Sequence, residues 1–384
     1  MWVDFTVVRQ YNFPTVIRFG AGAAAEIPAY CQKHGLLHPL VVSDPVVAEL
    51  PFFKTIAASL QQASVDAELF CQIHKNPVKS DVLAGKQCYR DTGRDSIIGI
   101  GGGAALDVAR AIALSINHHR DLFDYDDLIG GDQFVTEPIP HFITVPTTSG
   151  TGSEVGRSAI IAEDETKRKR ILFHPTLMAR TVFADPLLTM ELPSFITAAT
   201  GMDALTHNLE ALLAKGFHPM ADGVALQGIR LIAESIEDAV HRPSLESRAR
   251  MMLASMMGAV AFQKGLGVVH SMAHPLSSLL DTHHGLANAV CLPYGMAYNY
   301  RAEPGRLQEA ANAFGVSVDS EKSVMDWLSG INSRLSLPVK LSDIGVEEKH
   351  LEALSQLALE DFCHPANPRP VGLTDFAALY QQAL

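Results

Sequence analysis

The chain of 384 residues is 47% hydrophobic and 19% charged, and its formal net charge is −12. This balance is typical of a folded globular protein, and the length favours two domains over one. The excess of negative charge argues against nucleic acid or an anionic membrane as a partner, because both are bound through basic patches.

The first half of the chain alternates short apolar runs with amphipathic stretches. This pattern predicts strands at residues 39–44, 67–73, 96–100 and 141–145, with helices at residues 52–62 and 80–92. A further helix is expected in the sequence GGGAALDVARAIAL, which begins at residue 101. An alternation of strand and helix indicates a mostly parallel sheet.

From about Pro193 the composition changes to long segments rich in Ala, Leu and Met. The spacing of apolar residues predicts helices at residues 194–213, 221–240 and 247–262, and strand signals become scarce. We therefore predict an α/β domain over residues 1–187 and an all-α domain over residues 188–384.

A glycine cluster at residues 99–104 (GIGGGA) lies between a predicted strand and a predicted helix. It fits the pattern G-x-G-x-x-G/A, whose backbone N–H groups and helix N-terminus bind the pyrophosphate of a dinucleotide. A tight turn that needs glycine only for its backbone angles is the structural alternative.

Two other features near strand ends suit a dinucleotide. The loop at residues 146–154 (PTTSGTGSE) offers many small donors, as a phosphate, a ribose or an amide group requires, although such loops are often only turns. Asp44, at the end of the first strand, is either an ordinary turn carboxylate or an acceptor for a ribose diol, and the second role favours NAD over NADP.

Four side chains of the second half suit one divalent metal ion. Asp203 and His207 are four residues apart, so on a helix they project from one face. His270 lies in an apolar stretch, and His284 follows fourteen residues later. Each taken alone is more often a surface pair or a buried, hydrogen-bonded histidine, but together in apolar surroundings they favour a metal. Nitrogen and oxygen ligands suit Fe(II), Zn(II), Mn(II) or Co(II).

Other sequence features bear on location. The basic run at residues 167–170 follows acidic residues and predicts a solvated turn between two strands. Five scattered cysteines without a CxxC pair favour a reducing, cytoplasmic environment. The first ten residues lack the features of a signal peptide, and no apolar run approaches about 18 residues, so neither a signal peptide nor a membrane span is predicted.

Taken together, these motifs resemble those of the iron-containing, or group III, alcohol dehydrogenases, which are related to glycerol dehydrogenase and dehydroquinate synthase. The resemblance covers nearly the whole chain. It rests on FGAG (19–22), NP (76–77), GGGAALDVAR (101–110), VPTTSGTGSEV (145–155), FADP (183–186), GMDALTH (201–207), HSMAHPL (270–276), HHGLANA (283–289), LPYGMAYN (292–299) and NPR (367–369). It implies an N-terminal dinucleotide-binding α/β domain and a C-terminal helical domain, with cofactor and metal meeting between them.

The resemblance also implies an activity and its residues. The expected reaction is the NAD-linked interconversion of a small primary alcohol, diol or hydroxy acid and its aldehyde. Metal ligands would be Asp203, His207, His270 and His284, with Fe(II) expected first and Zn(II) as the alternative. His274 matches an additional histidine near substrate and nicotinamide, and it is expected to move the proton. The residues expected to contact NAD are Asp44, Asn76, Gly102, Gly103, Ala104, Asp107, Thr147, Thr148, Thr151 and Lys169.

Two positions depart from the family pattern, since Ala104 stands where a serine is common and Arg110 where a lysine is usual. Arg157 is either a structural arginine or a partner for a substrate carboxylate. The resemblance further implies a homodimer or a higher homo-oligomer. The alternative function is a hydroxyacid–oxoacid transhydrogenase, or another superfamily member with bound NAD and metal.

Overall fold

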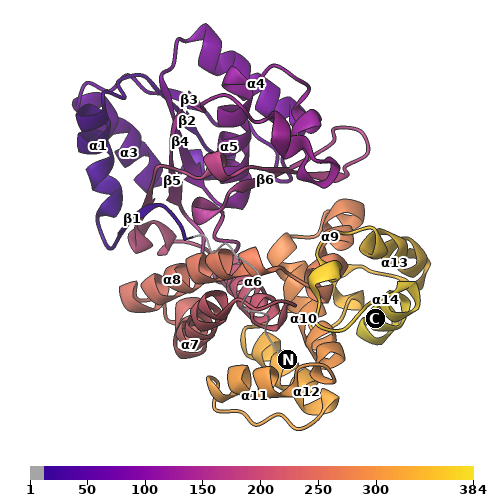
Figure 1. Cartoon of the computed structure of the whole chain (residues 1–384). Coiled ribbons are helices and arrows are strands. Elements are labelled where there is room, and N and C mark those ends of the chain that lie inside the picture. The colour runs from indigo at the N-terminus through magenta and orange to yellow at the C-terminus, as the bar shows by residue number, and fades with distance from the viewer. Residues whose placement is uncertain (1–12) are drawn as a thin grey trace. The chain divides into compact units, whose positions relative to one another are not determined.

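A computed structural model describes residues 13–384, and these divide into two units (Figure 1). The α/β unit comprises Pro14–Thr148 and Gly152–Glu191, and the helical unit comprises Leu192–Leu384 with the short segment Ser149–Thr151. The first ten residues, on which the prediction about a signal peptide depends, lie outside the described part.

The α/β unit is built on a six-stranded sheet in which every neighbouring pair is parallel. Its strands, in spatial order, are β1 (Val16–Phe19), β8 (Thr181–Ala184), β5 (His141–Pro146), β4 (Ser96–Gly101), β2 (Pro39–Val42) and β3 (Glu68–Phe70). Because parallel strands end at the same edge of a sheet, the loops after β2, β4 and β5 are neighbours. The predicted parallel sheet is thereby confirmed.

Helices cover both faces of this sheet (Figure 1). Alternate strand residues pack to opposite sides, so that Val41 and Ile98 belong to one apolar core and Leu40 and Ile97 to the other. The first core contains side chains of α1 (Ile27–His34) and α3 (Pro51–Gln62). The second contains side chains of α4 (Lys79–Asp91) and α5 (Gly103–Asn117), and a short α2 (Pro45–Ala48) follows β2.

The basic run predicted as a turn between two strands forms part of an antiparallel hairpin. Strands β6 (Ser158–Ala162) and β7 (Lys169–Phe173) pair with Ala162 opposite Lys169. Ala159, Ile161 and Leu172 of the hairpin join the core on the α4 and α5 side of the sheet. The predicted turn is confirmed for Lys167 and Arg168, but Lys169 and Arg170 begin β7. Arg170 is partly buried and pairs with Asp126 and Glu163 rather than facing solvent.

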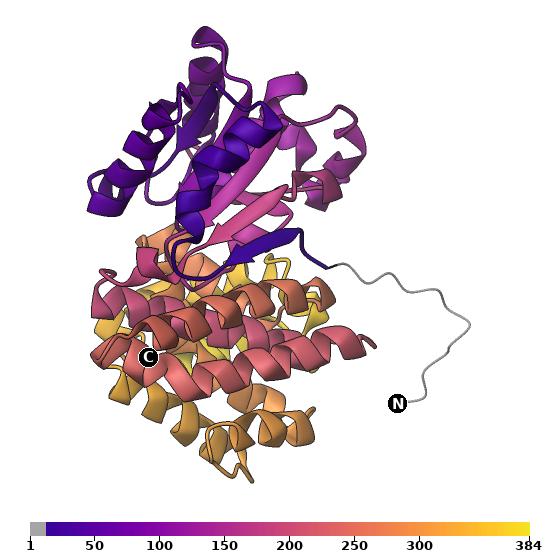
Figure 2. The ribbon, with the colours of Figure 1, turned by 90° about the vertical axis from the view of Figure 1, so that its left-hand side faces the viewer.

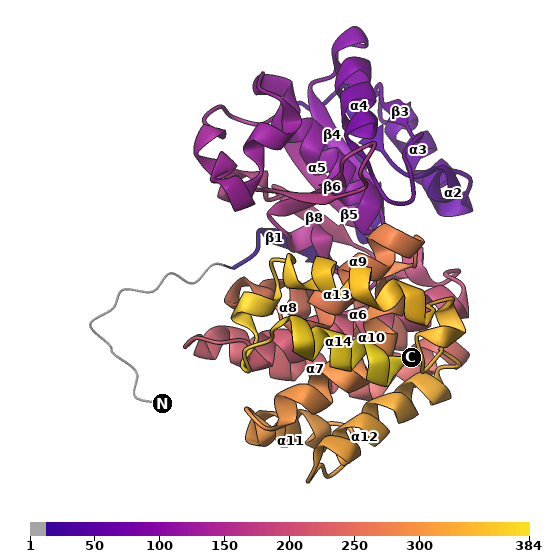
Figure 3. The ribbon, with the colours of Figure 1, turned by 90° about the vertical axis from the view of Figure 1, so that its right-hand side faces the viewer.

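The helical unit has nine α-helices over the described residues of its range. They are α6 (Ser194–Leu213), α7 (Pro219–His241), α8 (Leu245–Ala261), α9 (Val268–Leu280), α10 (His284–Tyr300), α11 (Pro304–Asn312), α12 (Glu321–Arg334), α13 (Leu351–Leu359) and α14 (Leu373–Ala383). Helix α6 packs against α7, α8 and α10, and nearly all of its side chains are buried. Figures 2 and 3 show α7 and α8 lying alongside α6, and Figure 3 shows α13 and α14 close together.

Over the described residues, no single helix is long and apolar enough to cross a membrane. One bent pair, Leu245–Lys264 with Val268–Leu280, passes that test by length and composition when its two parts are taken together. Both parts belong to the packed core of the helical unit, and core helices commonly pass the same test.

Candidate active site

Helix α6 carries the first two predicted metal ligands, Asp203 and His207, both buried. The helix begins after Pro193 and continues without interruption to Leu213, so residues four apart lie on one face. The Nδ1 atom of His207 is 2.9 Å from the backbone carbonyl oxygen of Asp203. This contact fixes the imidazole ring and directs its Nε2 atom away from the helix.

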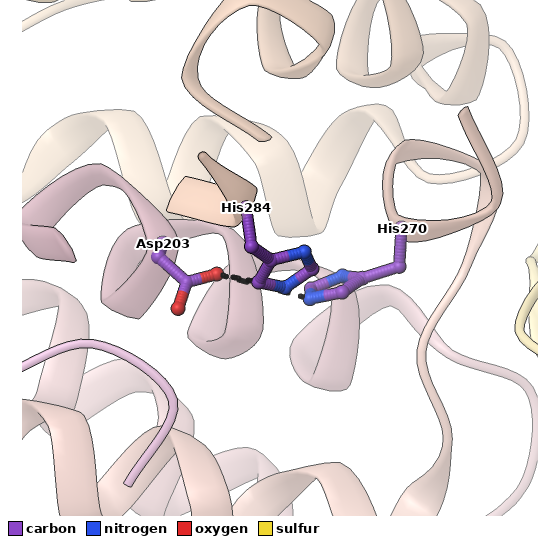
Figure 4. A group of neighbouring side chains, drawn as sticks. All are labelled: Asp203, His270 and His284. Carbon is purple, nitrogen blue, oxygen red and sulfur yellow. Dashed lines mark ion pairs between the residues drawn. The ribbon is translucent and has the colours of Figure 1, made fainter. Parts of the chain in front are cut away.

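The other two predicted ligands come from α10, which packs against α6, and from α9, which packs against α10. Figure 4 shows Asp203 with these two histidines. His270 lies on α9, and His284 is the first residue of α10. The Nε2 atom of His284 is 3.5 Å from Oδ1 of Asp203, and the corresponding distance for His270 is 4.0 Å. Ligand atoms of Asp203, His270 and His284 all lie within 4.8 Å of one another, and Nε2 of His207 is 3.0 Å from Nε2 of His270. The structure therefore brings all four side chains together.

A buried carboxylate, Glu210, sets the orientation of His270. Its oxygens accept hydrogen bonds from the backbone N–H groups of Gly267 (3.0 Å) and Val269 (2.7 Å) and lie 2.6 Å from Nδ1 of His270. Sequence reasoning missed this residue. It follows Asp203 and His207 at positions i+7 and i+3 of one helix face, and that spacing was the available signal.

These contacts decide the protonation of the two facing imidazoles. His207 and His270 each direct Nδ1 at an oxygen atom, so in their neutral forms Nδ1 carries the proton and Nε2 has a lone pair. Two lone pairs at 3.0 Å repel unless a cation or a proton lies between them. Burial lowers the pKa of His207 to about 4. At His270 burial also lowers the pKa, but the carboxylates of Glu210, Asp203 and Asp361 together outweigh it and raise the pKa. The donor set thus fits a divalent cation.

Two donors hold the carboxylate of Asp203. The side-chain N–H of Asn288 on α10 donates to Oδ1 (2.7 Å), and the hydroxyl of Thr151 donates to Oδ2 (3.2 Å). Thr151 is predicted to contact the cofactor, yet its segment belongs to the helical unit. Asn288 is not among the residues predicted from sequence, because a lone asparagine in a helix carries no signal of its own.

His274 lies one turn after His270 on α9, and its ring stacks on that of His284 with centroids 5.3 Å apart. Its Nδ1 atom is 2.7 Å from Oδ2 of Asp361, whose other oxygen accepts from the Ser271 hydroxyl (2.7 Å) and the Cys363 N–H (2.9 Å). Burial alone would raise the pKa of Asp361, but the imidazole and these donors lower that pKa to about 2. Asp361 is a second residue that sequence reasoning missed.

In the α/β unit, the glycine cluster forms the predicted connection between β4 and α5. Gly101 has a φ of +149°, and a Cβ atom there would lie 2.7 Å from Cβ of Ala105. A Cβ at Gly102 would lie 3.3 Å from the hydroxyl of Thr148. Gly102 caps α5 without a side-chain hydrogen bond, so the first N–H groups of this helix, including that of Gly103, are available to a ligand. Because Gly101 and Gly102 have no Cβ atoms, the backbone of this loop leaves room for a pyrophosphate to approach its N–H groups.

Asp44 and Thr147 flank this loop. Oδ1 of Asp44 accepts from the N–H groups of Val46 and Val47 (both 2.9 Å) and caps α2. Its Oδ2 faces Gly101, at 3.5 Å from the position of a Cβ atom there. The Thr147 N–H donates to the carbonyl oxygen of Gly101 (3.0 Å). One oxygen of Asp44 thus keeps the loop in shape, and the other is directed at the glycine cluster.

Asp107 is engaged within the α/β unit. Its oxygens accept from the Ser153 hydroxyl (2.6 Å), the Ile160 N–H (3.1 Å) and the guanidinium of Arg110 (3.1 Å). Arg110 is fully buried and also donates to the backbone oxygens of Ser153, Ser158 and Leu177. These contacts give Asp107 a structural role, and its contact with the cofactor stays a prediction.

The remaining predicted residues lie in separate places of the same unit. Ala104 is in the first turn of α5, Asn76 is in the loop between β3 and α4, and Lys169 begins β7. Arg157 is half-buried with its guanidinium 5.3 Å from the centre of the Phe173 ring, and no carboxylate of residues 13–384 pairs with it. The contacts of Ala104, Asn76 and Lys169 with NAD stay predictions.

A parallel sheet with a glycine-rich loop after one strand suits a dinucleotide, and a carboxylate–imidazole cluster suits a divalent cation; together they point to the class of metal-dependent dehydrogenases. Residues 14–186 match the family model of iron-containing alcohol dehydrogenase, and residues 197–384 match that of the Fe-containing alcohol dehydrogenase family, C-terminal. The chain belongs to the iron-containing alcohol dehydrogenase family, as the sequence motifs predicted. It is an oxidoreductase that interconverts alcohols and aldehydes, and the family implies NAD and a divalent metal, typically iron.

Individual relatives extend over almost the whole chain. A 4-hydroxybutyrate dehydrogenase from Cupriavidus necator is 36% identical and covers 96% of this chain and 98% of its own length. A 1,3-propanediol dehydrogenase from Klebsiella pneumoniae is 34% identical, with coverage of 97% and 98%. A crystal structure of a 1,3-propanediol oxidoreductase matches with a TM-score of 0.93 at 33% identity, over 98% of this chain and 100% of that one.

Proposed function

We propose that Asp203, His207, His270 and His284 bind one divalent cation, with Fe(II) expected first and Zn(II) as the alternative. The observation that carries the proposal is the approach of the Nε2 atoms of His207 and His270 to 3.0 Å, with both Nδ1 atoms already directed at oxygen. Nitrogen and oxygen donors without a thiolate suit these ions.

We propose that NAD binds at the β4–α5 loop. The N–H groups at the start of α5 would hold the pyrophosphate, and Gly102 and Gly103 leave room for it. Oδ2 of Asp44 would accept from the ribose diol, and its negative charge would repel a 2′-phosphate, which favours NAD over NADP. Thr147, Thr148, Asn76 and Lys169 remain proposed contacts.

When bound, the cation supplies Lewis acidity that lowers the pKa of an alcohol, and NAD supplies the hydride acceptor. The chain's own residues prepare the site for both. Asp203 provides negative charge, and Glu210 keeps His270 in the required tautomer. The apolar side chains of Val268, Val269, Met272 and Leu276 are fully buried in α9 and exclude water from its core-facing side.

His274 is proposed to carry the alcohol proton towards solvent, directly or through a water that it holds. Asp361 orients the ring by accepting at Nδ1, so Nε2 is the atom proposed to exchange the proton. The stacking of His274 on His284 places it beside the proposed ligands.

The proposed substrates are short primary alcohols that carry a second hydroxyl or a carboxylate. The names of the two relatives, a 4-hydroxybutyrate and a 1,3-propanediol dehydrogenase, support this class. Arg157, with no carboxylate partner among the described residues, is the proposed partner of a substrate carboxylate if the substrate is a hydroxy acid. A homo-oligomeric state and a cytoplasmic location stay predictions.

The test is a panel of short alcohols, diols and hydroxy acids, assayed by NADH absorbance with and without added Fe(II) or Zn(II). We expect metal-dependent NADH formation with at least one member, and higher KM for hydroxy acids in Arg157→Ala. Bound NAD without NADH accumulation, together with exchange between a hydroxy acid and an oxo acid, would favour the transhydrogenase. Activity in a metal-free protein would contradict the proposal.

A further inference from the structure

Asn288 is a fully buried residue of α10, one turn after His284. Its Nδ2 atom is 2.7 Å from Oδ1 of Asp203, 3.2 Å from Nε2 of His284 and 3.3 Å from Nε2 of His270. These are the three residues whose ligand atoms lie within 4.8 Å of one another. One amide group therefore faces three of the four proposed ligands.

The contact with Asp203 is the shortest of the three, and it is a hydrogen bond from an amide N–H to a carboxylate. The Thr151 hydroxyl donates to the other oxygen of the same carboxylate at 3.2 Å. With a donor on each oxygen, the carboxylate plane of Asp203 has one preferred orientation. The longer contacts join Nδ2 of Asn288 to the Nε2 atoms of His270 and His284. A bound cation would replace these two contacts, because it would take the Nε2 lone pairs.

We propose that Asn288 is a positioning residue of the metal centre, whose amide N–H holds the Asp203 carboxylate in the orientation that binds the cation. This inference rests on the proposed metal centre. Residues that orient a metal ligand through a hydrogen bond typically contribute about 10- to 100-fold to metal affinity. Asn288 acts on Asp203 in the way that Glu210 acts on His270.

The chain offers a matched control in Asn332 of α12. It is also fully buried, and its Nδ2 donates to the backbone oxygen of Ala289, the residue that follows Asn288. The Oδ1 atoms of both asparagines lack a hydrogen-bond partner among the described residues. The two side chains thus share complete burial and an Oδ1 atom without such a partner, but only Asn288 contacts Asp203, His270 and His284.

The experiment measures Zn(II) affinity of the full chain, without cofactor or substrate, by competition with a chromophoric chelator. We expect Asn288→Ala to weaken Zn(II) binding by about 10- to 100-fold and Asn332→Ala to leave it unchanged. Asn288→Leu fills the space of the side chain without restoring a donor, so it should weaken binding as Asn288→Ala does and serves if the alanine variant does not fold. In Co(II)-loaded protein, the visible absorption bands should change in the Asn288 variants and not in Asn332→Ala.

Wild-type Zn(II) affinity in both Asn288 variants, or an equal loss in Asn332→Ala, would overturn the inference. The variant Asp203→Ala separates this outcome from a failure of the metal centre itself. If Asp203→Ala abolishes Zn(II) binding while the Asn288 variants do not alter it, only the positioning role fails. If Zn(II) binding survives Asp203→Ala, both the proposed metal centre and the positioning role of Asn288 fail.

Discussion

The carboxylate of Glu210 allows a quantitative test of how the metal centre is organised. In Glu210→Gln, one oxygen stays and the other becomes an NH2 group. The NH2 group faces the Val269 N–H if it replaces Oε1, or the Gly267 N–H and His270 Nδ1 if it replaces Oε2. A buried donor left without an acceptor costs about 1–3 kcal/mol, so one or two such donors should lower the free energy of unfolding by about 1–6 kcal/mol. The loss of the carboxylate on Nδ1 should also weaken metal binding by about 10- to 100-fold.

The assay combines chelator competition for Zn(II) with urea unfolding of the metal-free protein. Asp185 provides the matched control, since this buried carboxylate accepts from the N–H groups of Gly22, Ala24 and Leu187 and contacts no proposed ligand. We expect Asp185→Asn to lower stability without changing Zn(II) affinity. The reasoning is refuted if Glu210→Gln unfolds at lower urea yet binds Zn(II) as tightly as the wild type.

Three further predictions concern other residues. Asp44→Asn keeps the cap of α2 but removes the negative charge, so kcat/KM with NADP should rise relative to NAD; an unchanged ratio would contradict the proposed ribose contact. His274→Ala should lower kcat by about 10²- to 10⁴-fold while the metal content stays at the wild-type level, and a wild-type kcat would exclude it from proton transfer. Burial raises the pKa of Glu154 from its ordinary 4.5 to about 7, so the folded state holds this proton more tightly and its stability falls as pH rises between those values. Over that interval Glu154→Gln should gain up to about 3 kcal/mol relative to the wild type in urea unfolding, and a pH-independent difference would contradict the shift.

Secondary structure could be predicted where the sequence pattern is long or is bounded by glycine and proline. Helix α6 agrees with its predicted residues 194–213, because Pro193 precedes it and apolar side chains continue to Leu213. The predicted strand at residues 67–73 is shorter in the structure, where β3 covers Glu68–Phe70. It lies at the sheet edge and pairs only with β2 over three residues, so no second neighbouring strand lengthens its hydrogen-bonded part.

Strands β1 and β8 were not predicted, although they pair with each other. Each has four residues, and their partners are distant in sequence, with Val16 opposite Thr181. Short strands of this kind are stabilised by the sheet they join rather than by a local pattern. Sequence alone therefore predicts the class of fold better than it predicts the short strands of the sheet.

The same limit applies to the site. The four proposed ligands are recognisable by residue type and spacing, but their hydrogen-bond partners are not. Asp361 lies 87 residues after His274, and Asn288 lies 85 residues after Asp203. Neither pair shares a local motif, because tertiary packing brings its members together: Asn288 lies on α10, and Asp361 lies in the loop after α13. Thr151, which the family resemblance assigns to the cofactor, lies in the loop after β5 and contacts Asp203 in the structure, although the two residues share no local motif.

The central claim is that one cation is held by a carboxylate and three imidazoles. X-ray absorption spectroscopy of Zn(II)- or Fe(II)-loaded protein tests it most directly. The account predicts one ion per chain, with imidazole scattering from three histidines and nitrogen or oxygen neighbours at about 2.0–2.2 Å. The imidazole contribution should decrease in His270→Ala. A spectrum without histidine scattering, or one that His270→Ala leaves unchanged, would contradict the account.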